Sequence, residues 1–179
     1  MKHKPFYLVL FLVLILSSDL ACGQGSLGAM PKKARTLDDY KHRTLIEIAA
    51  AGSDVVSPRD REDKDTTVVS GDILPSRVRV TYKGFVRPLP QSKKDVILRW
   101  ARQYAGDPAH YTVPYETEML FIEDGVDHWL TVKKSSLPHF KEELKEGEAV
   151  DLYVIRLGGI KSSDKWGWVL LVETFVKPK

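Results

Sequence analysis

From residue 73 onward, apolar and polar positions alternate in short runs that predict strands. Val78, Val80 and Tyr82, for example, alternate with arginine and threonine, which is the period-2 pattern of a strand with one solvated face. A central Asp-Gly pair separates two of the runs and predicts a hairpin turn. We expect the polar stretch 158–165 to be a mobile loop between the last two strands. The predicted strands cover 77–82, 116–123, 128–133, 150–157 and 166–176.

Three other segments repeat their apolar residues at intervals of three and four, as amphipathic helices do. Thr36 with Asp39, and Ser92 with Asp95, have the spacing of a capping box, so we expect helices to begin at Thr36 and Ser92. In the second helix, we expect the stripe that contains Trp100 to face the core rather than a ligand. The predicted helices cover 36–51, 92–105 and 137–146, and each ends before a glycine.

The order of these elements indicates the fold class. If the helix after the first strand is set aside, the order from residue 77 to 176 resembles an OB-type barrel, with its helix between strands three and four. We therefore predict a mostly β α+β domain. In detail, we expect an OB-like five-stranded barrel with a helix inserted after strand 1, preceded by an N-terminal helix. An SH3-like barrel or a helix-on-sheet α+β domain is the alternative.

The N-terminus has the pattern of a secretory signal. Lys2 and Lys4 precede an unbroken apolar run, 6–16, and small residues follow it. A membrane span needs about 20 apolar residues, and this run is shorter. We therefore predict an exported protein of the periplasm or cell envelope, with secretion as the alternative.

Cys22 is the only cysteine of the chain. It lies in Leu20-Ala21-Cys22-Gly23, which resembles the lipobox of bacterial lipoproteins, although Asp19 and Leu20 depart from that pattern. The resemblance implies lipidation of Cys22, and this anchor would be the only contact with a membrane. Ordinary cleavage after Gly23 is the alternative.

These observations divide the chain into five parts. Flexible composition follows the signal, and charges of both signs with little to bury predict a linker between the N-terminal helix and the β domain. The parts are a signal peptide, 1–23 (1–21 for a lipoprotein), a tether, 24–35, a helical segment, 36–56, a charged linker, 57–72, and the OB-like domain, 73–179.

Composition and charge narrow the range of functions. With 179 residues and 43% hydrophobic residues, the chain is long and apolar enough for one globular domain. The net charge is only +3, and acidic and basic residues are interleaved. Nucleic-acid-binding proteins usually show a clustered basic face, so we do not expect nucleic acid as a partner.

The sequence contains no recognised catalytic or cofactor motif. Gly-x-Ser-x-Gly, His-Glu-x-x-His and the phosphate-binding P-loop are all absent. The best metal candidates, Asp124, Asp127 and His128, gather at the predicted hairpin turn. Aspartate is favoured in turns for backbone reasons alone, so we expect neither a metal nor a cofactor.

Four residues near the last loop are candidates for ligand binding. Lys161 and Lys165 lie in the predicted loop, and Trp166 and Trp168 follow directly. In OB folds, the loop between strands four and five grips the ligand together with the loop after strand one, here 87–114. Exposed tryptophans beside lysines stack on peptides, sugars or bases. The alternative is that both tryptophans fill the core.

The expected function is therefore a non-enzymatic binding or interaction module, anchored at the envelope. Its partner would be an envelope protein, a peptide or a glycan. One alternative is a small exported hydrolase that uses carboxylates and His128. The other is a structural protein of the envelope.

Overall fold

The computed structural model describes residues 35–163 and 165–178. The predicted signal, Cys22 and almost all of the predicted tether lie outside these residues. Among the helices of the described residues, none has the length and apolar character that a membrane span requires.

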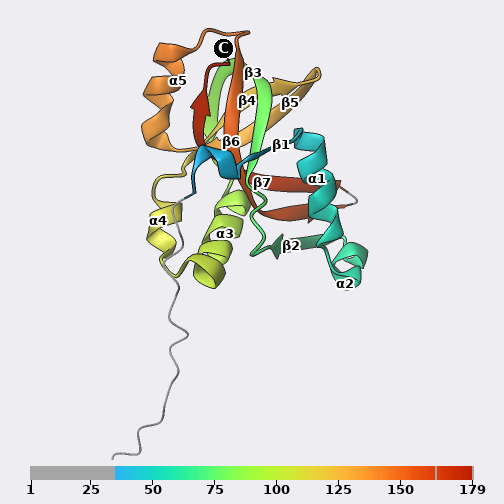
Figure 1. Ribbon diagram of the computed structural model, residues 1–179. Coiled ribbons are helices and arrows are strands. Elements are labelled where there is room, and N and C mark those ends of the chain that lie inside the picture. The colour runs from blue at the N-terminus through green and yellow to red at the C-terminus, as the bar shows by residue number, and fades with distance from the viewer. Residues whose placement is uncertain (1–34, 164, 179) are drawn as a thin grey trace, which may run out of the picture. The chain divides into compact units, whose positions relative to one another are not determined.

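The protein has a mostly β α+β fold, built on a mixed sheet of seven strands with several helices around it (Figure 1). The sheet order is β1-β3-β4-β5-β7-β6-β2, and β3 also pairs with β6. Strands β3, β4, β5, β7 and β6 consequently pair in a ring, in which only the β5–β7 pair is parallel. The strands are β1 Lys41–His42, β2 Asp65–Val69, β3 Ser76–Pro88, β4 Thr117–Glu123, β5 Val126–Val132, β6 Ala149–Ser162 and β7 Lys165–Val176.

The predicted hairpin is confirmed, but the predicted loop 158–165 is wrong. Asp124 and Gly125 form the β4–β5 turn with φ angles of 50° and 81°, as an Asp-Gly turn requires. The stretch 158–162 continues β6 and pairs with β2. Gly158 permits this pairing, because a Cβ atom there would lie 2.1 Å from the carbonyl oxygen of Val68. The glycine therefore serves close approach of two strands rather than loop mobility.

Gly158→Ala is expected to destabilise the protein by about 1–3 kcal/mol, because the backbone of β2 cannot yield as a flexible side chain does. Urea unfolding measures this effect. Gly167→Ala is the matched control, since an added Cβ there would meet only the carbonyl oxygen of Ile160, at 3.8 Å. Equal stability of the two variants would contradict the close approach of β2 to β6.

The helices differ from the prediction mainly in where they begin. The N-terminal helix starts at Leu45, not at Thr36. Thr36 and Asp39 do form a capping box, but it opens only one 3₁₀ turn, and the chain then extends into β1. A second capping box, Thr44 with Glu47, starts α1. The helices are α1 Leu45–Asp54, α2 Pro58–Glu62, α3 Gln91–Trp100, α4 Pro108–Thr112 and α5 Leu137–Glu143.

Two further boundaries differ from expectation. Helix α3 follows Pro90, which occupies the N-cap position expected for Ser92, and a short π-helical segment, Ala101–Ala105, extends it. The predicted linker 57–72 contains α2 and β2. The charged residues of α2 and β2 lie on the solvated sides of these elements. Composition alone does not distinguish such ordered elements from a linker.

Strand β6 separates two hydrophobic clusters, because its side chains alternate between its two faces. Val150, Leu152 and Val154 belong to the inner cluster, which the strand ring encloses with side chains from α1 and α5. Tyr153, Ile155 and Leu157 lie on the other face and belong to a second cluster with side chains of α3. Trp100 lies buried in this second cluster. The prediction that the Trp100 stripe faces the core is confirmed. Figure 1 shows α1, α3 and α5 on different sides of the strands.

A buried carboxylate with two arginine partners makes the folding stability of the protein depend on pH. The Asp151 carboxylate has no exposed surface and accepts hydrogen bonds from Arg79 Nε at 2.8 Å and Arg77 Nη2 at 2.5 Å. The two hydrogen bonds from Arg79, followed by the one from Arg77, hold the pKa of Asp151 below its usual range. A lowered folded-state pKa adds stability above the ordinary carboxyl pKa of about 4, and this stability is lost as pH falls through the folded value.

Asp151→Asn is therefore expected to be less stable than the wild type at neutral pH, and the difference should shrink below about pH 4. Urea midpoints of both proteins across this range measure the effect. A stability difference that stays constant with pH would contradict the lowered pKa.

Candidate ligand groove between β5 and β7

The main candidate site lies where β5 and β7 part. These strands pair only at Thr131 with Leu171 and at Val132 with Val172. Toward their beginnings, 126–130 pairs only with β4 and 165–170 only with β6, among the strands that the structure describes. The resulting groove has a volume of about 380 Å³, within the range of ligand sites. Its lining comes from α1, β3, α3, β5 and β7: Leu45, Ile46, Ala49, Arg87, Lys93, Asp127, His128, Trp129, Leu130, Trp166, Gly167, Trp168 and Leu170.

One wall consists of two stacked tryptophans. The rings of Trp166 and Trp168 are nearly parallel, at 14°, with centroids 5.4 Å apart. Two glycines make room for them: a Cβ atom at Gly52 of α1 would lie 2.6 Å from the Trp168 ring, and one at Gly159 of β6 would lie 2.8 Å from it. Both tryptophans are half-buried. Helix α1 and strand β6 thus hold the aromatic wall in a fixed position.

A buried cation lies beside this wall. Arg156 is only 1% exposed, and its guanidinium carbon lies 5.7 Å from the centroid of the Trp168 ring. Its hydrogen bonds are long, 3.4 Å each, to the carbonyl oxygens of Ile48 and Asp72. Burial lowers the pKa of Arg156. Among the described residues, no carboxylate lies within ion-pair distance of Arg156. The face of the Trp168 ring therefore supplies the favourable electrostatic contact for this buried cation.

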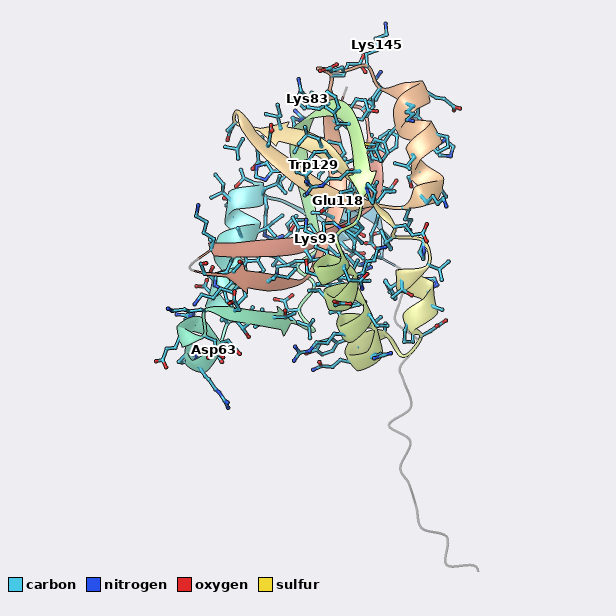
Figure 2. All side chains as sticks on the ribbon, turned by 180° about the vertical axis from the view of Figure 1, so that it is seen from behind. Asp63, Lys83, Lys93, Glu118, Trp129 and Lys145 are labelled. Carbon is cyan, nitrogen blue, oxygen red and sulfur yellow. The ribbon has the colours of Figure 1, made fainter. Side chains whose placement is uncertain are left out.

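The opposite wall is a charged network around Trp129. The Glu118 carboxylate is fully buried; it accepts a hydrogen bond from Arg87 Nε at 2.8 Å and another from Lys93 Nζ. The Arg87 guanidinium lies 4.0 Å from the centroid of the Trp129 ring. Lys93 also donates to the carbonyl oxygen of Trp129, at 3.2 Å. Figure 2 shows Lys93, Glu118 and Trp129 in succession from the start of α3 to the β4–β5 hairpin.

The floor of the groove is apolar, whereas the end nearest the hairpin turn carries polar side chains. Ile46 of α1 is 62% exposed and gives the floor an apolar surface. Asp127 and His128 lie at the end nearest the hairpin turn. Burial lowers the pKa of His128, so its imidazole is neutral at pH 7.

The predicted ligand-binding residues separate into two pairs. Trp166 and Trp168 line the groove, and Trp168 also packs against the inner cluster. Lys165 is exposed at the start of β7. Lys161 is only 7% exposed, and its Nζ donates to the carbonyl oxygen of Arg61 in α2. The Lys161 ammonium therefore has a structural partner on another element.

The predicted metal candidates lie close together in sequence but have different surroundings. Asp124 occupies the tight turn. Asp127 and His128 are consecutive in β5, so their side chains point to opposite faces of the sheet. Within 35–163 and 165–178, no group of three metal-ligating side chains is present.

Sequence reasoning missed the Trp129 wall. The sequence shows only that Glu118 directly precedes the apolar run 119–122 of the strand. Its partners are not visible in the sequence, since Arg87 meets Glu118 only through the β3–β4 register and Lys93 approaches from α3.

A second hollow, of about 340 Å³, lies at the start of α1 and includes Arg43, Thr44 and Glu123. The Glu123 carboxylate is almost buried and accepts the backbone N–H of Leu45 at 2.8 Å. Burial raises the pKa of Glu123. This carboxylate already occupies the helix N-terminus, where an anionic ligand would bind.

Comparisons of the chain with protein-family models, with curated proteins and with solved structures gave no match in any of the three.

Proposed function

We propose that this protein is a non-enzymatic binding module that holds its ligand in the groove between β5 and β7. The observation that carries the proposal is the pair of preformed aromatic walls, Trp166 with Trp168 and Trp129 with Arg87, on either side of a gap between strands. Binding sites combine such apolar walls with a few placed polar groups. Rigid walls also reduce the ordering cost of binding.

An OB-like architecture is part of the proposal. Strands β3, β4, β5, β6 and β7 would be its strands one to five, with α3 inserted after the first and α5 between the third and fourth. Supporting this assignment, the ring of pairings joins the third and fifth strands in parallel. OB folds bind ligands at strands two and three, between the loop after strand one and the loop between strands four and five. Of the groove residues, Trp129 lies in the third strand and Lys93 in the insertion after the first strand, while Trp166 and Trp168 lie at the start of the fifth strand.

We further propose that the module works outside the cytoplasm. The N-terminal signal pattern and Cys22 support an envelope location with a lipid anchor, and release into the medium is the alternative. A peptide or a glycan would suit the aromatic walls in either location.

The test is a screen of peptide and glycan collections with the protein purified from the fraction in which it accumulates. Trp129→Ala and Trp166→Ala are each expected to weaken the binding of any ligand found by about tenfold or more. Val113→Ala, at a residue that is 69% exposed and does not line the groove, is the control and should bind as the wild type does. Unchanged binding by folded Trp129→Ala and Trp166→Ala variants would overturn the proposal.

A further inference from the structure

We infer that the ligand is an extended peptide segment that adds as a strand to the open edge of β7 and presents an acidic side chain to Arg87 and Lys93. This inference rests on the proposed binding function and names its ligand class. Three observations carry it: the unpaired strand edge, a glycine that the fold does not require, and the charge of the facing wall.

The first observation is the open edge itself. Residues 165–170 of β7 pair with β6 on one side and, within the described chain, with no strand on the other. Such an edge presents N–H and C=O groups to an incoming chain. Residues 126–130 of β5 form the opposite edge, but Lys93 Nζ already binds the carbonyl oxygen of Trp129 there. A lysine at an edge discourages pairing, so β7 is the more accessible template.

The second observation is Gly167, which lines the groove between the two tryptophans. An added Cβ atom would meet only the carbonyl oxygen of Ile160, at 3.8 Å, and the φ angle of Gly167 is not positive. At Gly52, Gly158 and Gly159, by contrast, neighbouring atoms occupy the space of a side chain. A glycine inside a strand weakens it and often marks the close approach of another backbone. Gly167 is therefore explained by a ligand chain that passes beside it.

The third observation is charge complementarity. Glu118 balances part of the positive charge of Arg87 and Lys93 but has no exposed surface, whereas the Arg87 side chain is 43% exposed. Near Arg87 a ligand therefore meets the cations and not the Glu118 carboxylate, while the exposed Asp127 carboxylate lies at the hairpin end of the groove. An added strand alternates its side chains, so those on one face would contact Trp166, Trp168 and Ile46, and those on the other would face Arg87. This geometry favours a segment in which apolar and polar positions alternate, with an acidic residue opposite Arg87.

The experiment begins with a displayed library of random peptides of about ten residues, selected on the purified protein. Enriched peptides should share the alternating pattern and an acidic position. A synthetic peptide is then N-methylated at alternate amides, in two complementary sets. One set removes the hydrogen bonds to β7 and should weaken binding by about tenfold or more, while the other set should bind nearly unchanged. Equal effects of the two sets would overturn strand addition.

Two changes in the protein complete the test. Gly167→Val should keep or raise the melting temperature, because the fold has room for an added Cβ atom and valine favours a strand, and yet abolish peptide binding. Thr174→Val, an exposed position of β7 outside the groove, is the matched control and should leave binding unchanged. Replacing the acidic peptide residue by glutamine should weaken binding by about tenfold to the wild type and much less to Arg87→Met.

The possible failures are distinguishable. No enriched peptide, together with a glycan whose binding requires Trp129 and Trp166, would overturn the peptide inference and leave the proposed function intact. A peptide that binds equally well to Gly167→Val would also overturn the inference. Ligands of either class that bind without regard to the groove tryptophans would overturn both.

Discussion

Phe140→Ala is expected to lower the free energy of unfolding by about 3–5 kcal/mol, the usual cost of removing a buried phenylalanine. The Phe140 side chain has no exposed surface and stacks on Phe175 with ring centroids 4.1 Å apart. Tyr82 and Phe121 complete the aromatic group around it. Phe140 is the buried residue of α5 in the inner cluster, and Leu137 of the same helix packs against that cluster as well. The loss of the Phe140 ring therefore leaves a cavity that the surrounding strands fill only in part.

Urea unfolding measures this effect. His139→Ala is the matched control, because His139 is the preceding residue of α5 and is exposed, and its replacement should change stability by less than about 0.5 kcal/mol. A similar small effect of Phe140→Ala would show that α5 does not contribute to the core.

The double variant Arg87→Met, Lys93→Met is expected to lose about 3–5 kcal/mol, because it leaves the fully buried Glu118 carboxylate without either cation. Adding Glu118→Gln removes the stranded charge, so the triple variant should recover most of the loss. Chemical denaturation of the three proteins measures the difference. If Glu118→Gln restored nothing, the loss would come from packing of the long side chains and not from the charge network.

The sequence predicted those parts of the fold that depend on local chemistry. Alternation and the Asp-Gly pair identified the β4–β5 hairpin, and helical spacing identified the buried Trp100 stripe. The predictions failed where a distant partner determines the structure. Thr36 has a correct capping box, but β1 must pair with β3, so the helix begins only at Leu45. In the sequence, Gly158 resembles a loop residue. Only its pairing with β2 in the structure shows why a glycine is needed there.

In the candidate site, too, the sequence indicated the residues that are close together along the chain but not those that distant strands bring together. Trp166 and Trp168 were predicted, because two tryptophans beside a turn are visible in the sequence. The opposite wall brings Arg87, Glu118 and Trp129 together from three strands, through the registers of β3, β4 and β5. No spacing along the chain encodes these registers. For the same reason, the sequence did not reveal that Lys161 is directed to α2.

Amide hydrogen exchange with and without a bound ligand measures whether ligands bind between β5 and β7. If they do, we expect slower exchange at 165–170 of β7, which borders the groove, and no change around the exposed Val113. Protection confined to the hollow around Arg43 and Glu123, with 165–170 exchanging as in the free protein, would contradict binding between β5 and β7.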